Sequence, residues 1–105
     1  MTQESKLDPV ALDPDKFEIR FENAHVRVLE ARVAPGQGHG MHSHPKHLIY
    51  TFSSYTVKDT FMDGSTKSMG REAGEILWGD ALIHATENVG VTPVHCLIIE
   101  LKNST

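Results

Sequence analysis

Short apolar segments separated by turn residues constrain this chain more than any other feature of its sequence. No stretch has a sustained apolar period of 3.6 residues, which is the spacing that an amphipathic helix requires. Apolar and polar residues instead alternate over short runs, as they do in strands with one buried face. The runs expected to form strands are 17–22, 25–33, 48–52, 55–62, 65–69, 75–78, 83–89 and 94–101. This pattern predicts an all-β domain, either a sandwich or a barrel.

Turn residues mark the ends of these runs. Asp63-Gly64 lies between two alternating runs and predicts a two-residue hairpin, because both turn positions take positive φ. Asn88 is expected to shape the turn before Gly90. Residues 1–16 are polar and acidic and contain two prolines, so we expect a loosely ordered N-terminal arm. The remaining residues, 17–105, are expected to form one barrel domain.

Composition excludes several classes of partner. The 105 residues carry a net charge of −4, and the basic residues form no cluster, so we expect no nucleic-acid partner. No apolar run approaches the length of a membrane span, so we expect no membrane partner. The single cysteine, Cys96, is expected in the core and fits a reducing compartment. Because the N-terminus also lacks the features of a signal peptide, we expect a cytoplasmic protein.

Histidines gather in the middle of the chain, where His39, His42, His44 and His47 follow one another closely. In an extended strand alternate side chains share a face, so His42 and His44 should point the same way. Two neutral imidazoles directed at one point form two corners of a divalent metal site. Imidazole suits zinc, copper, iron and nickel better than magnesium or calcium. A histidine-rich loop in solvent is the alternative for this stretch alone. His84, on a later predicted strand, is the obvious third candidate ligand.

Two motifs give the chain a resemblance to a known family. Gly36 followed by His42-Ser43-His44 matches the start of the first cupin motif, and His84-Ala85-Thr86-Glu87-Asn88 matches the end of the second. From Phe17 to Lys102 the chain resembles a single-domain cupin. The run 42–47, of the form His-Ser-His-Pro-x-His, is similar to that of small bacterial cupins, some of which are labelled as β-alanine-degradation proteins. The resemblance implies a double-stranded β-helix, the cupin jelly-roll barrel, with three histidines converging inside.

One departure from the family pattern affects the expected metal site. The glutamate that normally follows the second histidine is missing, because its two possible positions hold Leu48 and Ile49. Pro45 can break the strand and reset its register, which would turn His47 inward as a replacement ligand. A histidine at the rim of the barrel is the alternative. The predicted metal ligands are His42, His44, His47 and His84, for a divalent transition metal such as Fe, Zn, Ni or Mn.

The predicted substrate pocket is lined by His39, Tyr50 and Trp78. Imidazoles alone leave a divalent ion with its full charge, so the ligand is expected to be a small anionic molecule. Three functions fit these expectations. The first is a metal-dependent enzyme, dioxygenase-like or of isomerase or lyase type. The second is a binding module without turnover, and the third is a metal-free structural barrel. Small cupins also dimerise, and the resemblance implies a homodimer here.

Overall fold

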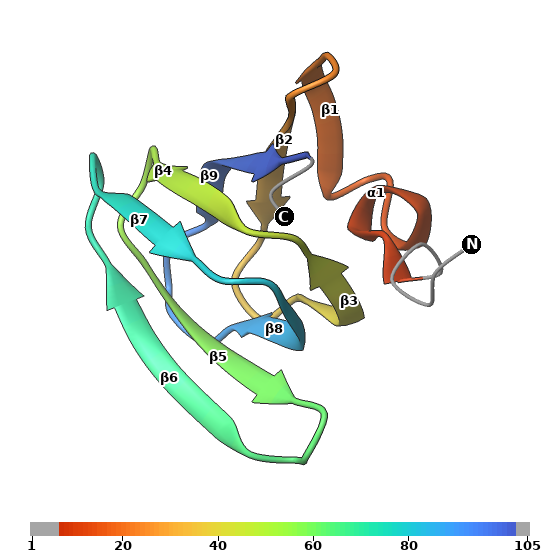
Figure 1. Cartoon of the computed structure of the whole chain (residues 1–105). Coiled ribbons are helices and arrows are strands. Elements are labelled where there is room, and N and C mark those ends of the chain that lie inside the picture. The colour runs from red at the N-terminus through yellow and green to blue at the C-terminus, as the bar shows by residue number, and fades with distance from the viewer. Residues whose placement is uncertain (1–6, 103–105) are drawn as a thin grey trace.

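Two antiparallel sheets face each other and form a barrel (Figure 1). The computed structural model describes residues 7–102. One sheet has five strands in the spatial order β1 (Phe17–Glu22), β2 (Val26–Val33), β9 (Val94–Leu101), β4 (His47–Thr51) and β7 (Ile76–Gly79). The other has four strands in the order β3 (Gly38–His44), β8 (Leu82–Asn88), β5 (Tyr55–Phe61) and β6 (Thr66–Arg71). The all-β barrel predicted from the alternating pattern is confirmed.

Strand β9 lies in the middle of the five-stranded sheet and shows how the barrel is filled. Its residues alternate strictly between buried and half-buried positions, with β2 on one side and β4 on the other. Ile98 lies opposite Leu29 of β2, and Cys96 lies opposite Ala31, so each pair buries its side chains together. The apolar core consists of Phe17, Leu29, Ala31, Val33, Tyr55, Val57, Val94, Cys96 and Ile98. Cys96 therefore lies in the core, as expected.

The predicted turns form where the sequence places them. Strands β5 and β6 make a hairpin, in which Gly64 has a φ of +87° and the Phe61 amide donates to the Ser65 carbonyl at 2.9 Å. Residues 62–65 connect the two strands, so the turn is longer than the two-residue turn expected. Asn88 is 1% exposed, and its side-chain oxygen accepts a hydrogen bond from the Gly90 amide at 3.0 Å. Asn88 therefore shapes the turn before Gly90, as expected.

The N-terminal segment contains a short helix, α1 (Pro9–Leu12). The Asp8 side chain caps this helix by accepting from the Val10 amide at 3.3 Å, and Pro9 occupies a position that suits helix starts. Pro9 is buried, and α1 lies against β1 and β3 (Figure 1). The part of the expected loose arm that the structure describes is thus packed on the barrel, and residues 1–6 lie outside the described range. No helix within residues 7–102 is long and apolar enough to span a membrane.

Leu29 offers a direct test of this core. Its side chain is 0% exposed, so Leu29→Ala should lower the free energy of unfolding by about 2–5 kcal/mol through lost burial and the cavity left behind. Denaturant unfolding followed by circular dichroism measures this loss. Val91→Ala is the control, because Val91 is 93% exposed and its truncation should change stability by less than about 0.5 kcal/mol. Equal losses in the two variants would contradict the described core.

Candidate metal centre

Neighbouring strands β3 and β8 bring three histidines together inside the barrel. His42 lies opposite His84 in the register of the two strands, and His44 follows His42 on the same face of β3. The ring centroids of His42 and His84 are 4.6 Å apart, and those of His42 and His44 are 5.0 Å apart. One nitrogen from each of the three rings lies within 4.8 Å of the others. A single ion can therefore contact all three rings after a small closing movement.

Hydrogen bonds hold the rings of His42 and His44 in one orientation. The Nδ1–H of His42 donates to the Gly40 carbonyl at 2.8 Å. Nδ1 of His44 lies 2.9 Å from Oε2 of Glu100, which reaches the same space from β9. A carbonyl or carboxylate acceptor fixes the proton on Nδ1 and leaves Nε2 free as a metal donor. This is the arrangement that metal-binding histidines normally have.

His84 has a carboxylate behind it as well. Its Nδ1 lies 3.2 Å from Oδ2 of Asp59, but the contact is not directed well enough to be a hydrogen bond, and this buried nitrogen has no hydrogen-bond partner among the described residues. The second oxygen of Asp59 accepts from the Thr86 hydroxyl at 3.0 Å. Burial raises the pKa of Asp59, but the contacts with His84 and Thr86 outweigh it and hold the pKa below its ordinary value. Asp59 is thus ionised and favours a proton on Nδ1 of His84.

Burial keeps the imidazoles of His42 and His44 neutral. It lowers the pKa of His42 to about 3, and it lowers the pKa of His44 despite the opposing effect of Glu100. A neutral imidazole offers its lone pair to a metal without first losing a proton. His42 and His44 therefore supply two neutral nitrogens with fixed tautomers, and the half-buried His84 completes the donor set. Such a set suits zinc, copper, iron or nickel better than magnesium or calcium.

The sequence interpretation missed Asp59 and Glu100. Both lie on the inward faces of their strands. Asp59 shares its face of β5 with Tyr55 and Val57, and Glu100 shares its face of β9 with Ile98. A carboxylate at a position where its neighbours form the core is the signal that could have revealed them, because buried charges need partners. Neither replaces the missing family glutamate, since each contacts a histidine Nδ1. They nevertheless place negative charge directly behind the donor rings.

His47 turns inward, as the expected change of register at Pro45 requires. Strand β3 ends at His44 in one sheet and β4 begins at His47 in the other, and both side chains are buried and line the interior cavity. The His47 ring is 5.2 Å from that of His44, and its Nδ1–H donates to the Pro45 carbonyl at 2.7 Å. Its Nε2 lies over Gly79, where an added Cβ would come within 2.3 Å. Within the described residues, the three-histidine donor group does not include His47.

A small cavity of about 120 Å³ adjoins the donor group. His39 lines it, because an irregularity in the β3–β8 pairing lets His39 and His42 face inward although they are three positions apart. Nδ1 of His39 lies 2.9 Å from Oδ2 of Asp13. Burial lowers the pKa of His39 and outweighs the contact with Asp13, which acts in the opposite direction. His47 and Arg71 line the same cavity.

Tyr50 and Trp78 do not line this cavity, in contrast to their expected role in the substrate pocket. Tyr50 alternates with the inward Ile49, so its ring lies outside and packs against Phe52 at 5.2 Å. Trp78 pairs with Leu48 on the same outer face and is 56% exposed. Its indole N–H donates to Asp80 at 3.0 Å. The alternation of β4, and the pairing of β7 with it, therefore place both aromatic rings on the outside of the barrel.

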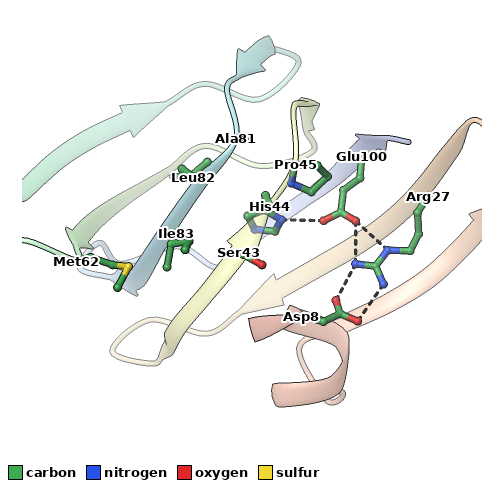
Figure 2. A pocket seen from close by; sticks show the side chains of 10 residues that line it. All are labelled: Asp8, Arg27, Ser43, His44, Pro45, Met62, Ala81, Leu82, Ile83 and Glu100. Carbon is green, nitrogen blue, oxygen red and sulfur yellow. Dashed lines mark hydrogen bonds and ion pairs between the residues drawn. The ribbon is translucent and has the colours of Figure 1, made fainter. Parts of the chain in front are cut away.

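A larger and more open hollow, of about 850 Å³, lies on the other side of His44 (Figure 2). It contains the ion pairs of Arg27 with Asp8 and Glu100. The Nε2 donors do not define this hollow, because only His44 of the three histidines borders it, and Nδ1 of that ring is bonded to Glu100. The chemistry of the site belongs to the smaller cavity.

Comparison with solved structures identifies the fold. A cupin domain from Bordetella pertussis Tohama I is similar with a TM-score of 0.75 and 20% identity, over 82% of this chain and 91% of that one. A cupin superfamily protein from Desulfitobacterium hafniense gives 0.62 and 17%, over 83% and 76%. Oxalate decarboxylase from Bacillus subtilis gives 0.56 and 24%, over 75% of this chain and 22% of that one. No family model and no curated protein matches the sequence. The chain has the cupin fold, a double-stranded β-helix.

Substitution of single histidines tests the donor group. His42→Ala, His44→Ala and His84→Ala should each abolish stoichiometric Zn²⁺ binding, because two imidazoles hold the ion far more weakly than three. His47→Ala should retain it with a smaller loss of affinity, because His47 lies outside the group of three. Titration against a chelating dye measures the affinities. The exposed His25→Ala is the control, and Zn²⁺ binding that survives in all three of the first variants would rule out this centre.

Proposed function

We propose that the protein is a metal-dependent enzyme of the cupin fold that acts on a small anionic metabolite. The observation that carries this proposal is the group of three inward-facing imidazoles, each with Nδ1 facing an acceptor, beside a small cavity. A bound divalent ion supplies Lewis acidity and an open coordination position. The cavity of about 120 Å³ is smaller than most ligand pockets, which favours a substrate of few heavy atoms.

Charge at the cavity supports an anionic ligand. The direct donors are neutral, so the ion keeps positive charge on the side that faces the cavity. Arg71 adds a cation to the cavity lining, and within residues 7–102 it forms no ion pair, although it contacts the Met69 sulfur at 2.9 Å. A carboxylate of the ligand would contact the ion, and Arg71 adds to the positive charge of the same cavity. The structural neighbour named oxalate decarboxylase supports a dicarboxylate as the first probe.

Competition between charged and neutral probes tests the anion preference. Oxalate should bind the Zn²⁺-loaded protein more tightly than oxamide, its neutral diamide of similar shape. Arg71→Gln should weaken oxalate binding without changing Zn²⁺ affinity, whereas Arg32→Gln, an exposed arginine paired with Glu30, should change neither. Isothermal titration calorimetry measures the affinities for oxalate, oxamide and Zn²⁺. Equal affinity for oxalate and oxamide would remove the anion preference from the proposal.

Turnover of dioxygenase, isomerase or lyase type is the catalytic part of the proposal. Oxygen uptake by the iron-loaded protein with a panel of small carboxylates and thiols separates the first type from the other two. Product analysis with the same panel under nitrogen identifies the others. His84→Ala is the inactive control, because it removes one donor of the centre. A protein that binds the metal and a carboxylate but turns over none of the panel would instead be a binding module.

A homodimer in the cytoplasm is the setting that we propose for this activity. Support for a second copy comes from the outer face of the five-stranded sheet, where several large apolar side chains are exposed. They are Phe21, Leu48, Tyr50, Ile76 and Trp78. Trp78→Glu should shift the protein towards the monomer in size-exclusion chromatography with light scattering, because a charge opposes burial of this face. Val91→Glu, at an exposed loop position, should not, and a wild-type monomer would overturn the dimer.

A further inference from the structure

Glu100 connects the metal centre to the outside of the barrel. It is 3% exposed on the inward face of β9. One carboxylate oxygen, Oε2, contacts Nδ1 of His44 at 2.9 Å, and the other, Oε1, accepts from Nε and a terminal nitrogen of Arg27, each at 2.8 Å. Both oxygens are therefore committed, one to a candidate metal ligand and one to a guanidinium group. The position of Glu100 depends on both partners.

Arg27 extends the connection to the N-terminal segment. It makes a two-pronged contact with Asp8, in which the guanidinium nitrogens donate to Oδ2 at 3.1 Å and to Oδ1 at 2.7 Å. Figure 2 shows the unbroken series from His44 through Glu100 and Arg27 to Asp8. The Arg27 side chain is 17% exposed, so its charge is balanced by these two carboxylates more than by water.

Asp8 also controls the start of α1. The same side chain that binds Arg27 accepts a hydrogen bond from the Val10 amide and precedes the buried Pro9. A second carboxylate of the segment, that of Asp13, contacts His39 at the cavity. The segment is thus held against the metal centre at two points, one through Arg27 and Glu100 and one through His39.

Loss of one member of such a series should affect the others. An uncompensated charge in a partly buried position is costly. Without Asp8, the Arg27 guanidinium would therefore shift towards Glu100, its remaining carboxylate partner. Removal of a group that orients a metal-binding histidine typically lowers metal affinity by about 10–100-fold. Coupling between two binding events is reciprocal, so whatever the segment contributes to metal affinity, the metal contributes to docking of the segment.

We infer that Glu100 is a positioning residue for His44 and that the Asp8–Arg27 pair couples docking of α1 to metal binding. This inference rests on the proposed metal centre and adds the contacts of α1 to it. By reciprocity, metal binding favours the arrangement of Glu100, Arg27 and Asp8 that orients His44, and so it favours docking of α1. The N-terminal segment is therefore part of the metal site and stabilises it from outside the barrel.

Zn²⁺ titration of matched aspartate variants tests the coupling. Glu100→Gln should weaken Zn²⁺ binding by about 10–100-fold. Asp8→Asn should weaken it severalfold, whereas Asp15→Asn, an exposed aspartate of the same segment, should leave it unchanged. The double variant Asp8→Asn/Glu100→Gln should lose less than the product of the two single losses, because the residues act in one series. The Co²⁺ absorption spectrum should shift in Glu100→Gln but not in Asp15→Asn, which distinguishes an effect on the ligand from a general loss of stability.

Hydrogen exchange supplies the reciprocal test. Zn²⁺ should slow amide exchange in residues 10–13 of the wild type, and this protection should disappear in Glu100→Gln. Wild-type affinity in Asp8→Asn, or exchange that is unaffected by Zn²⁺, would overturn the coupling while leaving the three-histidine centre intact. A wild-type protein that binds no Zn²⁺ would overturn the centre and the coupling together.

Discussion

Three imidazoles buried inside a barrel, each with Nδ1 facing an acceptor, are the constraint on which the rest of this structure depends. Imidazole is polar at both nitrogens, so its burial requires partners for both. Acceptors for Nδ1 come from Gly40 of β3, Asp59 of β5 and Glu100 of β9, and thus from both sheets. The Nε2 atoms converge without such acceptors. A shared cation is the partner that this arrangement of donors suits.

A role in the metal site explains the buried carboxylates of Asp59 and Glu100 better than a contribution to folding stability does. A buried ion pair contributes little net stability, because desolvation cancels much of its attraction. Asp59 and Glu100 nevertheless occupy inward positions that apolar residues could fill. At a metal centre they orient the histidines, fix their tautomers and offset part of the charge of the ion. The Arg27 ion pair then balances Glu100 towards the surface, and Asp8 balances Arg27.

Most of the fold and three members of the site could be predicted, because both depend on alternation along strands. The His-x-His pair and the later His84 require only that their strands be neighbours, which the resemblance implied and β3 and β8 confirm. Alternation alone does not say which face is inward. The predictions for His47 and Tyr50 placed two residues three positions apart on one face, which an uninterrupted strand forbids. The structure turns His47 inward and Tyr50 outward.

Other parts of the site depend on contacts between segments far apart in the sequence. His39 faces the cavity only because the β3–β8 pairing is irregular, and Asp13 reaches it only because α1 packs on the barrel. The link from His44 to Asp8 joins three regions of the chain through side chains alone. No local pattern encodes such contacts.

The most direct test of the central claim is a crystal structure of the Zn²⁺-loaded protein, with an anomalous difference map at the zinc edge. The account predicts one strong peak inside the barrel, about 2.0–2.1 Å from Nε2 of His42, His44 and His84. A peak bound through surface carboxylates, or an empty barrel in zinc-saturated crystals, would contradict it.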